Sequence, residues 1–180
     1  MSRIKSDASA TELTTAFSSD EFFMSHVSGI KLTNSKTNDD GTGNNPMFVV
    51  EFEIDEGPYK GRRIGNLERN IGHILMIGGK TKEGKDMPIR ALLEFIDALK
   101  LPWTATPNGK LVSRPFKRVN QGGSMIFVDP DTNQRIANIE YDPGEAPNFS
   151  LWVGKRCKVR YGVRKFNDRD YNEVVALAPL

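Results

Sequence analysis

The segment MFVVEFEID, at residues 47–55, is the feature that most constrains the fold of this 180-residue chain. In an extended segment, successive side chains point to opposite faces. One face of this segment is apolar and the other is acidic: Phe48, Val50, Phe52 and Ile54 against Glu51, Glu53 and Asp55. Because this period of two is typical of a half-buried β-strand, the chain is predicted to be built on a sheet.

Turn residues and hydrophobic periods place the other elements. Residues 21–33 predict a first strand that Gly29 bends or bulges, and residues 34–46, rich in Asn, Asp, Gly and Pro, predict a long loop. Residues 61–67 predict a third strand, and residues 69–79 predict a short helical turn that Gly78 and Gly79 end. Residues 86–102 predict the main helix, capped by Asp86, ended by Pro102, and with an apolar stripe at Ile89, Leu92, Leu93, Ile96 and Leu99.

The last third of the chain predicts two hairpins. Residues 124–141 read as two short strands around a turn at 129–134, within an insertion at about 103–150. Residues 152–166 and 171–180 predict two long strands joined by the turn NDRD. Residues 1–20 are rich in Ser, Thr and Ala without an apolar period, so we expect a flexible N-terminal arm outside the core.

The order of these elements is three strands, a helix, an insertion and two strands. It predicts a mainly β fold, a β-barrel with one main helix, and specifically a five-stranded OB-fold with an inserted β-hairpin region between the helix and the fourth strand. Residues 21–180 then form a single domain. A fragment of a β-sandwich with a helix would give the same order and stays open.

Composition excludes several classes of protein. The single Cys157 cannot form an internal disulfide, and two isolated histidines, His26 and His73, are a poor set of metal ligands, so neither a metal nor another cofactor is expected. There is no apolar run of membrane-spanning length, which favours a soluble protein of the cytoplasm without a membrane partner. No complete G-x-x-x-x-G-K-[ST] phosphate-binding loop and no nucleophile with a His and acid partner can be recognised, so we do not expect an enzyme.

The predicted fourth strand carries the clearest chemical signal. Its odd positions, Cys157, Val159, Tyr161 and Val163, suit a barrel interior, whereas its even positions are cationic: Arg156, Lys158, Arg160 and Arg164. Such a row of like charges either pairs with acids on another strand, here Glu51, Glu53 and Asp55, or faces a polyanion. We favour the polyanion.

Aromatic residues flank the same region and could stack nucleic-acid bases. Phe166 and Tyr171 lie on either side of the NDRD turn, and Tyr59 lies in a turn beside three cations, Lys60, Arg62 and Arg63. Ordinary packing at a barrel corner is the alternative role for each ring. The candidate nucleic-acid-binding residues are therefore Tyr59, Lys60, Arg62, Arg63, Arg156, Lys158, Arg160, Arg164, Phe166 and Tyr171.

Three runs, GTGNNPMFVVEFEIDEGPYKGRRI, ALLEFIDALKLP and WVGKRCKVRYGVRKFNDRDYNEVVALAP, together resemble a family of bacteriophage OB-fold single-stranded DNA-binding proteins. The resemblance implies a protein that coats single-stranded DNA during phage replication or recombination in the host cytoplasm, with phage replication or recombination proteins as further partners. The oligomeric state stays open, a homodimer included. An OB-like module that binds another protein, as a phage adaptor or host-takeover protein, is the alternative function, and RNA is an alternative ligand.

Overall fold

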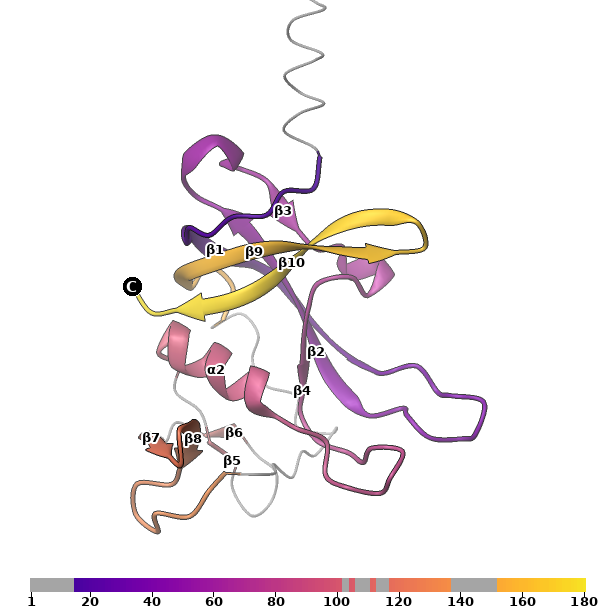
Figure 1. Ribbon diagram of the computed structural model, residues 1–180, viewed down its shortest axis with the longest axis vertical. Helices are drawn as coiled ribbons and strands as arrows, with labels where there is room; N and C mark the ends of the chain where they lie inside the picture. Colours follow the sequence, from indigo (N-terminus) through magenta and orange to yellow (C-terminus); the bar gives the residue numbers. More distant parts are fainter. Residues whose placement is uncertain (1–14, 102–103, 106–110, 113–116, 137–151) are drawn as a thin grey trace, which may run out of the picture.

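The computed structural model describes residues 15–101, 104–105, 111–112, 117–136 and 152–180 (Figure 1). These residues form a mainly β structure with one α-helix, as predicted. The main sheet is antiparallel throughout, in the order β10-β9-β1-β2-β3, with β4 also paired to β2. Its strands are β1 (Phe23–Asn34), β2 (Pro46–Ile54), β3 (Arg63–Ile64), β4 (His73–Met76), β9 (Arg156–Phe166) and β10 (Arg169–Ala178).

The predicted strands at the start of the chain are confirmed. The apolar face of β2 is fully buried, and the acids Glu51, Glu53 and Asp55 are half-buried on the other face. The register of β1 against β2 shifts between Val27 and Gly29, so the expected irregularity is present. A Cβ on Gly29 would lie 2.8 Å from Cδ1 of Leu67, and glycine therefore lets the 3-10 turn η2 (Leu67–Arg69) approach β1 closely.

The helical turn predicted at 69–79 is wrong, because this segment holds β4. His73 to Met76 pair with Val50 to Met47 of β2, beyond the short β3. The apolar spacing at Ile71, Ile74 and Leu75 fits a helix, but pairing with the exposed edge of β2 satisfies the backbone and buries Leu75 completely. Tertiary pairing thus overrides the local pattern.

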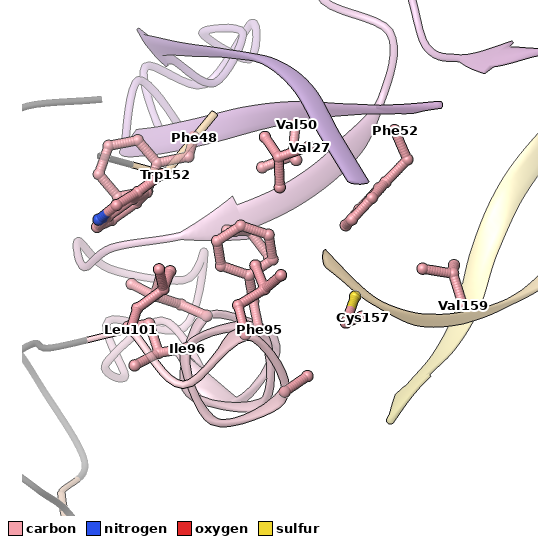
Figure 2. Close-up of a cluster of buried hydrophobic side chains, with 14 of the residues drawn as sticks. Val27, Phe48, Val50, Phe52, Phe95, Ile96, Leu101, Trp152, Cys157 and Val159 are labelled. Atoms are coloured by element: carbon pink, nitrogen blue, oxygen red, sulfur yellow. The ribbon is translucent and has the colours of Figure 1, made fainter. Parts of the chain in front are cut away.

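The main helix, α2 (Arg90–Leu99), buries the whole predicted stripe from Ile89 to Leu99. Its ends differ from the prediction. Asp86 makes an ion pair with Lys80 instead of capping the helix, and the helix ends at Lys100 in the left-handed conformation (φ 54°). Figure 2 shows the core between α2 and the sheet, where the ring of Trp152 meets Phe48 at 5.4 Å and Phe95 at 6.1 Å between centroids.

The described part of the insertion contains the predicted turn at 129–134 and, before it, a hairpin that was not predicted. β8 (Ser124–Val128) pairs with β7 (Lys117–Gln121), which precedes it across Gly122 and Gly123. At the predicted turn, the Asp129 amide donates to the Gln134 carbonyl oxygen and the Ile136 amide donates to the Phe127 carbonyl oxygen, both at 2.9 Å, and an isolated bridge joins Val128 to Arg135. The rest of the predicted second strand lies outside the described residues. The described parts of the insertion also include β5 (Thr104–Ala105) and β6 (Leu111–Val112).

Among the described residues, no hydrogen-bonded pairing joins β4 to β10, so the sheet is not closed into a barrel by strand pairing. We call the boundary between these two edges the seam. Helix α2 contacts β4, β9 and β10, and so packs across one part of the seam (Figure 1).

The closing hairpin extends beyond the rest of the sheet. β9 pairs with β1 only from Arg156 to Val159, and further along it pairs only with β10. We call residues 160–176 the β9–β10 arm. The odd positions Cys157, Val159 and Tyr161 are buried as predicted, but Val163, which lies further toward the tip of the arm, is 41% exposed.

Residues 15–20 contradict the prediction that the first twenty residues stay outside the core, whereas residues 1–14 lie outside the described part of the chain. Phe17 is only 8% exposed and joins the core cluster. The Ser19 amide donates to the Tyr161 carbonyl oxygen at 3.1 Å, and Asn172 bonds both backbone groups of Phe17. One buried aromatic ring and these hydrogen bonds together fix the segment, which composition alone does not reveal.

Candidate nucleic-acid interface

A groove follows the seam between the β3–β4 region and the β9–β10 arm. One section, of about 330 Å³, lies between residues 69–74 and one side of the arm, which contributes Arg164, Phe166 and Tyr171. A second section, of about 300 Å³, contains Arg62 and Arg63. Both sections are lined by Arg69, Ile71, Tyr171 and Asn172, so we treat them as one groove. Figure 1 shows the tip of the arm beside η2, which forms the facing wall.

The wall opposite the arm is a tight turn with its own hydrogen bonds. The Ile71 amide donates to the Asn66 carbonyl oxygen at 2.9 Å, and the Asn66 amide donates to the Ile71 carbonyl oxygen at 2.6 Å. The Asn66 side chain also accepts from the Arg69 amide at 3.4 Å. These bonds hold Arg69 at the groove. The sequence prediction missed Arg69 because it assigned this segment to a helix.

The arm presents a face of alternating cations and aromatic rings. Arg164 pairs with Tyr171 and Phe166 pairs with Arg169, and residues directly opposite in an antiparallel pair point to the same side. Asn167 and Asp168, with φ of 49° and 60°, form a two-residue turn of the kind that matches the twist of a hairpin. Phe166 is 56% exposed, which leaves an apolar ring available for stacking. Arg169 was assigned to the turn and not predicted as a site residue.

The groove has an excess of positive charge. Arginines 62, 63, 69 and 164 line it, against the acids Asp170 and Glu173. Of these arginines, Arg63 lies 3.4 Å from a Glu53 carboxylate oxygen, whereas Arg69 and Arg164 form no ion pair within the described part of the chain. Burial lowers the pKa of His73 to about 4, so this groove residue is neutral at pH 7.

Two of the predicted site residues in the 57–63 turn, Tyr59 and Lys60, do not line the groove. Tyr59, at the end of the 3-10 turn η1 (Gly57–Tyr59), has one face covered by the ring of Phe17, with centroids 3.7 Å apart and planes 7° from parallel. Lys60 is exposed and lines neither section of the groove. The neighbouring Arg62 donates to the Thr15 carbonyl oxygen at 2.6 Å, and burial lowers its pKa below the ordinary value.

The predicted cations of β9 differ in their surroundings. Arg156 lies 3.5 Å from the buried Oδ2 atom of Asp55, so the acid-pairing alternative applies to this residue even though β1 separates the two strands. His26 of β1 bridges the gap, with Nδ1 2.6 Å from Asp55 and Nε2 3.5 Å from Glu53. Lys158 is exposed without an ion pair among the described residues.

Arg160 lies 6.0 Å above the Phe22 ring, and neither Arg160 nor Lys158 lines the groove. Of the four predicted cationic positions on β9, only Arg164 is therefore a groove residue. Whether Lys158 and Arg160 bind nucleic acid stays a prediction.

His26, Glu53 and Asp55 also form a group that could hold a metal ion, with one ligand atom from each within 4.8 Å of the others. The sequence analysis treated His26 as an isolated ligand. In the structure it has two carboxylates beside it, so that expectation is wrong for His26. Its two neighbouring carboxylates are also paired with Arg63 and Arg156, so the charges in this group already balance without a metal. The Cys157 thiol is buried, which raises its pKa to about 12 and keeps it protonated.

Comparisons of the chain with protein-family models, curated proteins and solved structures find no match. The resemblance to phage single-stranded DNA-binding proteins therefore stays an expectation. Within the described residues, no helix combines the length and apolar character that crossing a bilayer requires.

Proposed function

We propose that this protein binds single-stranded DNA in the groove, largely independently of sequence. The observation that carries the proposal is the convergence, from two distant parts of the chain, of Arg62, Arg63 and Arg69 with Arg164, Phe166 and Tyr171. Proteins that bind single strands without sequence preference combine a cationic groove for the backbone with aromatic rings for the bases, and the groove offers both.

The charge pattern suits a phosphate backbone. Arg69 and Arg164 approach the groove from opposite walls, and neither has an acidic partner among the described residues. Phe166 and Tyr171 are on the same face of the arm as Arg164, so stacked bases and contacted phosphates can lie side by side. Base stacking on an aromatic ring contributes about 1–3 kcal/mol for each base and does not depend strongly on base identity.

The strand order supports an OB-like architecture for this function. In the predicted barrel the fourth strand pairs with the first and fifth, and here β9 pairs with β1 and β10. The hairpin between the last two strands is one of the loops with which OB-folds bind oligonucleotides. A role in phage replication or recombination rests on the sequence resemblance and is proposed on that basis alone.

A matched pair of charge reversals tests the groove. Arg69→Glu with Arg164→Glu changes groove residues, whereas Lys158→Glu with Arg160→Glu makes the same change in net charge on β9 outside the groove. Binding of a labelled thymidine oligomer is measured by fluorescence anisotropy, with duplex DNA and single-stranded RNA as competitors. Charge-assisted hydrogen bonds contribute about 1.5–3 kcal/mol each, so the groove pair should weaken binding by about 100-fold or more and the control pair by much less.

The opposite ranking of the two pairs would move the site to the outer face of β9. If the wild-type protein binds no oligomer at low salt, the groove is not a nucleic-acid site. The alternative, a protein partner, then gains support from the exposed apolar residues of the arm, Val163, Phe166 and Val175.

A further inference from the structure

The ring of Tyr59 and the guanidinium group of Arg62 are arranged as a nucleotide subsite, but the chain itself occupies them. Phe17 lies flat on Tyr59, 3.7 Å away, which is the geometry of a base stacked on an aromatic ring. The Arg62 guanidinium carbon lies 5.3 Å from the Phe17 centroid and 5.9 Å from the Tyr59 centroid. Arg62 also donates to the carbonyl oxygen of Thr15, where a bound strand would offer a phosphate oxygen.

This subsite continues the groove. Arg62 and Arg63 line the second section together with Ala16, which belongs to the occupying segment. A single strand that follows the groove from Phe166 past Tyr171 and Arg69 therefore reaches residues 15–17 next. At that point its next base and phosphate would meet positions already filled by Phe17 and Thr15.

The occupying segment can leave without breaking any strand pairing. Residues 15–19 have no regular secondary structure. The Ser19 amide donates to Tyr161, and Asn172 is bonded to the backbone of Phe17. Release breaks the bonds of Asn172 to Phe17 and of Arg62 to Thr15 and exposes the Phe17 ring. A base stacked on Tyr59 would replace the ring contact, and a phosphate oxygen would replace the Thr15 carbonyl oxygen at Arg62.

We propose that Tyr59 and Arg62 form an additional base-and-phosphate subsite, and that single-stranded DNA long enough to fill the groove displaces residues 15–17 from it. This inference rests on the proposed function. It makes the segment an internal competitor of the DNA, and the Phe17 ring the group that the DNA must replace.

Hydrogen exchange of the wild-type protein tests the displacement directly. Amide exchange is measured with and without a saturating thymidine oligomer of about 16 nucleotides, the upper end of the site size of one OB-fold. We expect the Phe17 amide to exchange about tenfold faster or more with DNA, because its bond to the Asn172 side chain is lost, while the Ile71 amide in the groove wall gains protection. Binding that leaves the Phe17 amide equally or better protected overturns this inference and leaves the proposed function standing. Absence of binding overturns both.

A pair of Phe→Ala variants gives an independent readout. Phe17→Ala removes the competing ring and should tighten binding of the same oligomer by about tenfold, because the apolar burial that holds residues 15–17 in the subsite is lost. Phe22→Ala, at a position just before β1 that is 40% exposed and outside the groove, serves as the control and should leave affinity unchanged. If folded Phe17→Ala binds as the wild type does or more weakly, the Phe17 ring is only a structural element. If Phe17→Ala does not fold, the exchange experiment on the wild type decides.

Discussion

The salt dependence of DNA binding should reveal how many groove arginines contact phosphates. For single strands, the slope of log K against log[salt] is about −0.7 for each phosphate neutralised. If Arg62, Arg63, Arg69 and Arg164 all contact phosphates of a long oligomer, the slope is about −2.8, and affinity falls about 50-fold between 50 and 200 mM salt. Arg164→Ala removes one contact and should give a slope of about −2.1, with a fall of about 18-fold over the same range.

The assay is a series of anisotropy titrations at four or more salt concentrations, with unfolding curves to show that each variant is folded. Lys158→Ala is the matched control, because it removes one exposed cation of β9 that does not line the groove. It should lower affinity slightly and keep the wild-type slope. An unchanged slope for Arg164→Ala, or an equal change for Lys158→Ala, would refute the assignment of phosphate contacts to the groove.

Three further predictions concern buried groups. Because burial lowers the pKa of His73 from its ordinary 6.5 to about 4, the unfolded state binds more protons between these values and stability falls as pH decreases. The loss from pH 7 to 5 should be about 2 kcal/mol in urea unfolding and should be absent in His73→Gln. The Cys157 thiol, with its pKa raised to about 12 by burial, should react with thiol reagents only after unfolding, and reaction in the native state would contradict its place in the core. Tyr161→Phe removes a buried 2.7 Å hydrogen bond to Ser25 and should cost about 1 kcal/mol of unfolding free energy, whereas an unchanged midpoint would show that this bond contributes nothing.

Elements with a strong hydrophobic period could be predicted from the sequence. The buried face of β2 and the stripe of α2 follow from periods of two and 3.6, because each element buries one face in a single core. β4 could not be predicted in this way. Its apolar residues suit either a helix or a strand, and only the free edge of β2 decides between them.

Several residues of the candidate site could be predicted from the sequence, but the groove that they form together could not. Arg164, Phe166 and Tyr171 could be selected from charge, aromatic character and their place beside a hairpin turn. Arg69 could not, because it joins them only through the folding of the β3–β4 region against the arm. Likewise, the sequence left Asp55 as one possible partner of the cationic row on β9, and only the folded chain selects Arg156 as the residue that pairs with it.

The unpaired seam between β4 and β10 determines how the groove can respond to its contents. Where strands are hydrogen-bonded, their separation is fixed at about 4.8 Å. A change of one residue in register would move every side chain of the strand to the opposite face of the sheet. Across the seam no such ladder sets the separation within the described residues; the packing of α2 against both strands contributes to it instead. The width of the groove is therefore set by side-chain packing, and small side-chain adjustments can change it without a change in strand register. If the groove binds DNA as proposed, it can accept both purines and pyrimidines, and substitutions on the buried face of α2 would alter DNA affinity through the spacing of the two walls.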